Sequence, residues 1–215
     1  VFTPFYGRWR EHGWRRPADT CAGSARWIDP ADVANRSSLP NPGVELALPA
    51  GEAAARRHWE RFAEAELADY DAHRDRPDLD GTSRMSAYLH FGNIHPRTVA
   101  VDLDQRSAGP RAYLRQLAFR DFYAAVLAAW PHSAWQNFNP TVDAIEVDDD
   151  ADAQRLFTAW KEGRTGFPIV DAGMRQLQQT GFLPNRVRMI VASFLVKDLH
   201  LPWQWGARWF LEQLV

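Results

Sequence analysis

From residue 51 onward, the apolar positions of this chain recur at helical spacing, and no stretch shows the alternation of apolar and polar residues that predicts a β-strand. Within residues 52–75, Trp59, Phe62 and Tyr70 fall on one side of a helix. The same spacing predicts helices over residues 96–106, 110–130, 151–163, 168–180, 186–199 and 203–214. Prolines at helix starts and glycines at helix ends support these bounds. The pattern therefore predicts an all-α domain over residues 51–215.

Residues 1–50 differ in character, because prolines and glycines are frequent there and indicate turns. We expect them to form an irregular connector laid over a surface, leading from a preceding domain. The chain begins with Val1 and ends at Val215 within a helical pattern. We interpret it as a fragment, with a helical domain that is incomplete at its C-terminus.

Composition narrows the class of protein. A hydrophobic content of 46% in 215 residues is enough for one sizeable core. The net charge of −2 gives no general attraction to nucleic acid, although a local basic face remains compatible with it. Cys21 is the only cysteine, which excludes an intramolecular disulfide and fits a reducing compartment. The histidines lack metal-ligand spacing, and no apolar run is long enough for a membrane. We expect a cytoplasmic monomer without a metal site.

Residues 80–86 carry the strongest local signal of a binding site. Thr82, Ser83 and Ser86 offer hydroxyl groups and Arg84 a cation, directly after Gly81 and before an apolar helical pattern. A turn that opens into a helix directs unpaired backbone N–H groups toward one point, where the helix dipole is positive. The segment therefore predicts a seat for phosphate oxygens. An ordinary helix cap explains the hydroxyl groups equally well.

Two predicted helices add candidate ligand contacts. One face of the helix over residues 110–130 presents Tyr113, Gln116, Arg120 and Tyr123. Such a stripe suits a planar ligand with an anionic group, and a solvated helix face is the alternative. Asn185 and Arg188 project together at a helix start, where an amide and a guanidinium can hold a polar heterocycle or a phosphate, or merely cap the helix.

Four segments together resemble the flavin domain of the DNA photolyase/cryptochrome family. They span residues 70–86, 116–123, 162–177 and 185–199, and their order and lengths agree with those of the family. The similarity covers most of the chain from about residue 60 onward. It implies an all-helical domain that holds FAD in a folded, U-shaped form. It also implies a second antenna chromophore, of folate or deazaflavin type, in a preceding N-terminal domain.

The resemblance assigns roles to the candidate residues. Those expected at the FAD phosphates and ribityl chain are Tyr70, Thr82, Ser83, Arg84, Met85 and Ser86. Those expected along the flavin and adenine rings are Tyr113, Gln116, Arg120, Asn185 and Arg188. Trp203 matches the middle member of the family's tryptophan electron relay. The surface member falls on Asp150, and the flavin-proximal member falls beyond Val215.

The activity that the resemblance implies is light-dependent DNA repair. Family photolyases excite reduced FAD with blue light, pass an electron to a cyclobutane pyrimidine dimer in damaged DNA and recover it after the ring splits. We therefore expect a carbon–carbon lyase, with the fragment itself not fully active. Gln116 and Asn185 are expected beside the lesion, and Arg74, Phe119 and Asn185 at the DNA.

Three departures from the family pattern lie on the lesion side. Gln116 stands where such photolyases usually have glutamate, and Phe119 stands where they have a stacking tryptophan. Residues 182–184, Phe-Leu-Pro, replace a Trp-Met-His sequence. A cryptochrome-like blue-light photoreceptor that binds FAD without repairing DNA is therefore an alternative function. A third alternative is a helical domain that no longer binds flavin, against which the intact segment at residues 82–86 argues.

Overall fold

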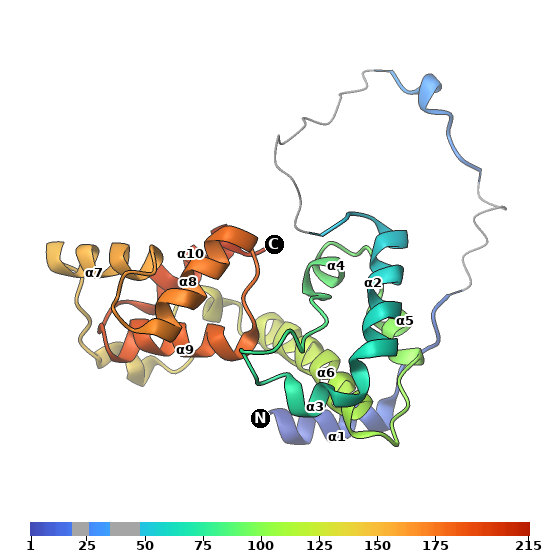
Figure 1. Ribbon diagram of the computed structural model, residues 1–215, viewed down its shortest axis with the longest axis horizontal. Coiled ribbons are helices and arrows are strands. Elements are labelled where there is room, and N and C mark those ends of the chain that lie inside the picture. Colours follow the sequence, from blue (N-terminus) through green and yellow to red (C-terminus); the bar gives the residue numbers. More distant parts are fainter. Residues whose placement is uncertain (19–25, 35–47) are drawn as a thin grey trace.

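The computed structural model describes residues 1–18, 26–34 and 48–215, and these residues form helices and turns without a β-strand (Figure 1). The α-helices are α1 (Phe2–His12), α2 (Glu52–Ala65), α3 (Tyr70–His73), α4 (Ser86–His90), α5 (Pro96–Val101), α6 (Ala108–Ala129), α7 (Ala151–Lys161), α8 (Pro168–Thr180), α9 (Asn185–Lys197) and α10 (Trp203–Gln213). Short 3-10 helices are η2 (Pro30–Asp32), η3 (Leu67–Asp69), η4 (Pro131–Ala134) and η5 (Pro140–Ala144). The predicted all-α fold is confirmed.

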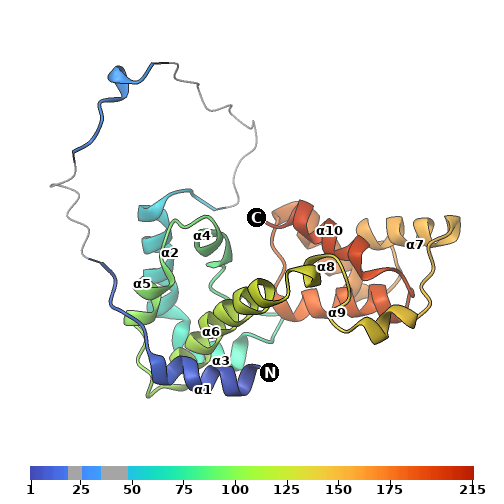
Figure 2. The same ribbon diagram turned by 180° about the vertical axis from the view of Figure 1, so that it is seen from behind.

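The helices form two groups, each around its own apolar cluster (Figures 1 and 2). The first cluster is built by α2 to α6 and extends from Ala55 to Leu117. The second is built by α7 to α10 and extends from Ala153 to Leu201, with Trp160 fully buried at its centre. Helix α6 belongs to the first group at its N-terminal part and leads toward the second group at its C-terminal part. No helix of one group packs extensively on a helix of the other within the described residues.

Glycines allow close packing at three points, against backbone in one case and against side chains in two. A Cβ atom on Gly109 of α6 would lie 1.9 Å from the carbonyl oxygen of Leu67. In the second group, a Cβ on Gly173 would lie 2.6 Å from Val187, and one on Gly206 would lie 2.4 Å from Leu195. These three positions therefore fix the distance at which α6 meets η3, α8 meets α9 and α10 meets α9.

The expected irregular connector is wrong for residues 2–12, which form helix α1 and pack on α6. The reason is an aromatic stripe at helical spacing, formed by Phe2, Phe5, Tyr6 and Trp9. The ring of Phe2 stacks on Phe119 with centroids 3.5 Å apart, and the indole of Trp9 donates a hydrogen bond of 2.9 Å to Asp121. The part of the connector at residues 19–25 and 35–47, including Cys21, lies outside the described residues.

Among the described residues, no helix combines the length and the apolar character needed to cross a membrane.

Candidate functional site

A cavity of about 460 Å³ lies between the two groups of helices. Arg84, Ser86 and Tyr88 line it from the first group, and Thr180 and Phe182 line it from the second. We call this cavity the inter-group cleft. Arg84 also lines an adjacent cavity of about 310 Å³, together with Thr82 and Ser83. The hydroxyl-rich segment therefore faces two neighbouring cavities rather than a single one, and Arg84 stands between them.

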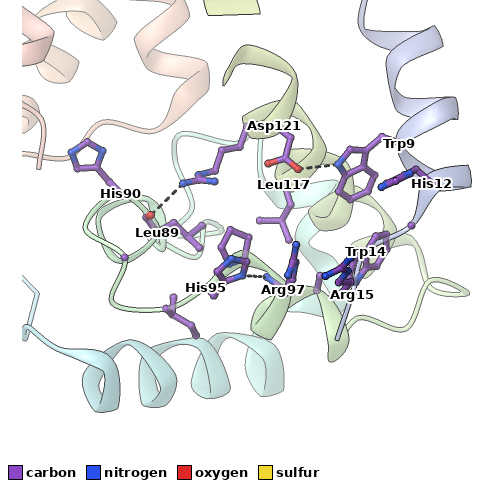
Figure 3. Close-up of a pocket in the computed structure, with 16 residues that line it drawn as sticks. Trp9, His12, Trp14, Arg15, Leu89, His90, His95, Arg97, Leu117 and Asp121 are labelled. Atoms are coloured by element: carbon purple, nitrogen blue, oxygen red, sulfur yellow. Dashed lines mark hydrogen bonds between the residues drawn. The ribbon is translucent and has the colours of Figure 1, made fainter. Parts of the chain in front are cut away.

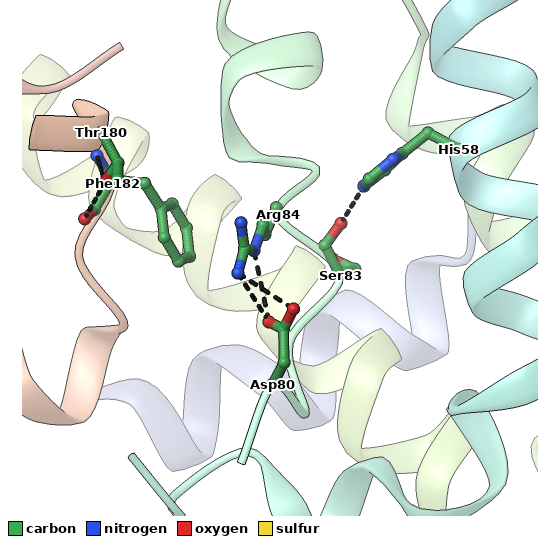
Figure 4. A network of polar contacts seen from close by, with 6 residues as sticks. All are labelled: His58, Asp80, Ser83, Arg84, Thr180 and Phe182. Carbon is green, nitrogen blue, oxygen red and sulfur yellow. Dashed lines mark hydrogen bonds and ion pairs between the residues drawn. The ribbon is translucent and has the colours of Figure 1, made fainter. Parts of the chain in front are cut away.

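Arg84 occupies an unusual backbone conformation, with a φ of 49°. Its guanidinium donates to both carboxylate oxygens of Asp80 at 2.9 Å and lies 5.2 Å from the centre of the Phe182 ring (Figure 4). The side chain therefore reaches across to the second group. The ion pair with Asp80 offsets part of the positive charge that the sequence predicted at this seat. A guanidinium carries five N–H groups, so donors remain for an anionic ligand.

Ser83 and its neighbours are part of the first core. The hydroxyl of Ser83 is 2.8 Å from the phenolic oxygen of Tyr113 and accepts a hydrogen bond from the backbone N–H of Met85. Met85 and Tyr70 are buried in the same cluster. Burial raises the pKa of Tyr113 well above its usual value, although the hydrogen bond with Ser83 acts to lower it. Tyr70, Tyr113 and Met85 therefore hold the predicted phosphate segment in place from behind, and their side chains do not line the inter-group cleft.

Two buried nitrogen atoms at predicted ligand positions have no hydrogen-bond partner. They are Nε2 of Gln116 on α6 and Nε of Arg188 on α9. Arg188 is anchored through Nη2, which donates 3.0 Å to the carbonyl of Leu183, and burial lowers the pKa of its guanidinium. An unpaired buried donor costs about 1–3 kcal/mol, so native structures rarely retain one without a purpose. Both atoms are donors available to a ligand, and neither Gln116 nor Arg188 lines the inter-group cleft or the adjacent cavity.

Predicted DNA contacts meet at the junction of α3 and α9. Arg186 of α9 forms an ion pair of 3.0 Å with Asp75, and Arg74 approaches the same carboxylate at 3.7 Å. Asn185, next to Arg186, is exposed. Arg74 and Asn185 are thus brought to one region of the surface by Asp75, a residue that the sequence analysis did not single out.

Arg120 and Phe119 lie apart from that junction. Arg120 is exposed and directs Nη2 toward the carbonyl of Leu89, at 3.4 Å, on a different cavity. One face of Phe119 is covered by Phe2 of α1, so it is not free for a base. The prolines and glycines of residues 1–50 led to a prediction of turns, so α1 was missed. The helical spacing of the aromatic residues in α1 could have indicated its contact with Phe119.

The predicted electron-relay positions have other partners in the structure. The indole of Trp203 donates a hydrogen bond of 2.8 Å to Asn137, and within the described residues its ring contacts no other aromatic ring. Asp150, at the expected surface position, caps helix α7 by accepting from the N–H of Ala153 at 2.8 Å. The relay role of Trp203 stays a prediction.

Known proteins similar to this chain include DNA photolyases and a cryptochrome. Residues 113–215 match the family described as the FAD binding domain of DNA photolyase. The deoxyribodipyrimidine photo-lyase of Halobacterium salinarum is 40% identical over 100% of this chain and 47% of its own length. A bacterial class III photolyase from Agrobacterium tumefaciens has a similar structure, with a TM-score of 0.73 and 38% identity over 78% of this chain and 35% of that one. The Synechocystis sp. PCC6803 cryptochrome gives a TM-score of 0.71 and 30% identity over 79% of this chain and 36% of that one.

The helical fold, with a cleft between two helical groups, is that of an all-α domain. The chain belongs to the DNA photolyase/cryptochrome family. It spans about half the length of the curated relatives that it matches.

Proposed function

We propose that this chain binds FAD at the junction of the two helical groups, beside the inter-group cleft, and serves light-dependent repair of cyclobutane pyrimidine dimers in a DNA photolyase. The observation that carries the proposal is the pair of unpartnered buried donors, Gln116 Nε2 and Arg188 Nε, because a ligand with several acceptors resolves both. Family membership names FAD as the ligand. The 40% identity to a deoxyribodipyrimidine photo-lyase supports the repair activity.

Different residues would contact different parts of the cofactor. Arg84, Thr82 and Ser86 would bind phosphate oxygens, since they line the cavities with free donors. Gln116 and Arg188 would bind polar edges of the ring systems. Bound FAD supplies the light absorption and the electron transfer, while the chain positions it and excludes water.

The lesion side of the proposal concerns Arg74, Asn185 and Arg186, which form a polar rim at the α3–α9 junction. Phosphate contacts by these arginines would offset the absence of long-range attraction from a net charge of −2. We also propose that Phe119 stacks on an extruded base, which requires that α1 move away from it.

The test of flavin binding uses Gln116→Leu in the 215-residue chain, with Arg111→Ala as a control, because Arg111 is exposed on the same helix. Removing an unpaired buried donor should leave the free energy of unfolding of the flavin-free chain unchanged or higher. The same change should weaken FAD binding about tenfold, since one hydrogen bond is lost from a buried site, at about 1.4 kcal/mol. Unfolding in urea and titration with FAD measure the two effects. Equal FAD affinity in Gln116→Leu, the control and the unchanged chain would contradict the assignment.

The test of repair uses the natural protein that contains this chain. Dimer-containing DNA should be repaired in blue light and not in the dark. The alternative function is a blue-light photoreceptor that binds FAD without repairing DNA, which the similarity to a cryptochrome and the covered face of Phe119 favour. Flavin-loaded protein that leaves dimers intact under light would establish this alternative and reject repair.

A further inference from the structure

A larger cavity, of about 1030 Å³, lies on the first group of helices (Figure 3). We call it the α1–α5 cavity, because the end of α1 and the loop before α5 form its walls. Trp9, His12, Trp14 and Arg15 lie on one side of it, and His90 lies on the other. It shares no lining residue with the inter-group cleft. Its volume is at the upper end of the range for small-molecule sites, about 300–1,000 Å³.

The charge on this cavity is unbalanced. Arg15, Arg97 and Arg120 line it, and within the described residues none of the three forms an ion pair. Asp121 is the one carboxylate on the wall, and it already accepts a hydrogen bond of 2.9 Å from the indole of Trp9. Three guanidinium groups without a carboxylate partner around one cavity favour an anion, because a guanidinium offers paired N–H donors to phosphate or carboxylate oxygens.

An aromatic wall stands beside these cations. Trp9 and Trp14 stack with ring centroids 5.0 Å apart and planes inclined by 28°. Both side chains line the cavity and are partly exposed. The hydrogen bond from Trp9 to Asp121 fixes the first indole on α6, and the second indole packs against it. Indole faces bind planar rings by stacking, and this wall therefore favours an aromatic ligand.

A metal ion does not account for the cavity. His12, His90 and His95 line it, but the described residues contain no group of three or more histidine, cysteine, aspartate or glutamate side chains placed to hold a metal. His95 instead accepts a hydrogen bond of 3.1 Å from the backbone N–H of Arg97 and so caps α5.

We infer that the α1–α5 cavity is a second ligand site, which binds a planar aromatic ring that carries a phosphate or carboxylate group. A nucleoside phosphate has this chemistry, either free or as a nucleotide of an unpaired DNA strand. The ring lies on the Trp9–Trp14 wall, and the anionic group pairs with Arg97 and Arg15. The lining residues of the α1–α5 cavity are distinct from those of the inter-group cleft.

The experiment titrates the 215-residue chain with adenosine monophosphate, and separately with a short single-stranded oligonucleotide and with inorganic phosphate. Tryptophan fluorescence and calorimetry report binding. Adenosine monophosphate should bind more tightly than phosphate, and Arg97→Ala should weaken it about tenfold, or about 1.4 kcal/mol. Trp14→Ala should reduce both the affinity and the quenching. The matched control is Arg111→Ala, which removes an exposed arginine of α6 outside the cavity.

The outcomes distinguish a DNA strand from a free nucleotide as the ligand, and this cavity from another binding site. Tighter binding of the oligonucleotide than of the free nucleotide, sensitive to Arg97→Ala, identifies a DNA strand as the source. The reverse order identifies a free nucleotide. Equal effects of Arg97→Ala and Arg111→Ala overturn the proposal, as does the absence of binding at millimolar nucleotide. Binding that is lost in Gln116→Leu and kept in Arg97→Ala places the nucleotide near Gln116, outside the α1–α5 cavity, and also overturns the proposal.

Discussion

Residue 84 combines a strained backbone with a long cationic side chain. A φ of 49° places Arg84 in the left-handed region, where residues with a Cβ rarely lie and where the cost is about 1–3 kcal/mol. The same residue reaches Asp80 in its own segment and Phe182 in the second group. Strain of this kind persists where the surrounding structure fixes it, and it concentrates at ligand sites.

Replacing Arg84 by glycine and by alanine separates the backbone from the side chain. Both changes remove the guanidinium, but only glycine adopts the left-handed conformation without strain. We expect Arg84→Gly to unfold with a free energy about 1 kcal/mol higher than Arg84→Ala, measured in urea without flavin. FAD affinity should fall in both variants. An alanine variant as stable as the glycine variant would show that the left-handed conformation is not retained in solution.

The partners of Arg84 mark the limit of sequence analysis at this scale. The hydroxyl groups and the arginine at residues 82–86 stand together in the sequence, so a polar seat could be predicted. The contact with Phe182 could not, because it joins residues from two helical groups. The covered face of Phe119 was not predicted either. Its partner Phe2 lies in a segment whose prolines and glycines indicate turns.

Among the elements, α8 depends on a carboxylate in its first turn. Asp171 accepts hydrogen bonds from the hydroxyl and the backbone N–H of Thr165, at 2.6 and 2.7 Å, and from the N–H of Gly166 at 2.9 Å. Burial acts to raise the pKa of Asp171, but these hydrogen bonds outweigh it and lower the pKa below its usual value. The charged form therefore ties the preceding loop to the helix.

Asp171→Asn should lower the free energy of unfolding at pH 7 by about 1–3 kcal/mol, because the loop donors lose a charged acceptor. The pKa of Asp171 is lower in the folded chain than in the unfolded chain, where it is about 3.9. The charged carboxylate therefore stabilises the fold at any pH above about 3.9. This contribution disappears as the pH falls through the pKa of the folded state. The variant and the unchanged chain should therefore converge in stability as the pH falls below about 3.9, as measured by urea unfolding. Asp152→Asn, at an exposed carboxylate of α7, serves as control. A constant difference across this pH range would contradict the prediction.

Most helices could be predicted because proline and glycine mark their ends. Pro168 begins α8 and Gly181 ends it in a left-handed conformation, at the bounds that the sequence suggested. The segment predicted as one helix over residues 52–75 is instead divided into α2, η3 and α3. Gly109 of α6 packs against this division, where a Cβ would lie 1.9 Å from the carbonyl oxygen of Leu67.

At the scale of the whole molecule, the two helical groups are connected mainly by α6 and by side-chain contacts between them. The contacts that the structure shows between the groups include the Asp75–Arg186 ion pair and the Arg84–Phe182 contact. Exposed ion pairs contribute about 0–1 kcal/mol, so most of the stability of each group is its own.

We therefore expect the flavin-free chain to unfold in two steps. Calorimetry, or tryptophan fluorescence with circular dichroism in urea, should show transitions that do not coincide, because each cluster melts with its own midpoint. Saturating FAD should merge them, since a ligand that contacts both groups stabilises only the state in which both are folded. A single coincident transition without FAD would show that the two clusters form one cooperative unit.

The exposed bridge between Asp75 and Arg186 also bears on how a large ligand reaches the cleft. This ion pair is weak, and each apolar cluster lies within one helical group. The two groups can therefore rotate apart about the end of α6 while each stays folded. Loading is then a hinge motion, with a barrier set by a few polar contacts rather than by local unfolding. Salt, which screens such contacts, would speed the opening of the empty chain and leave its cores intact.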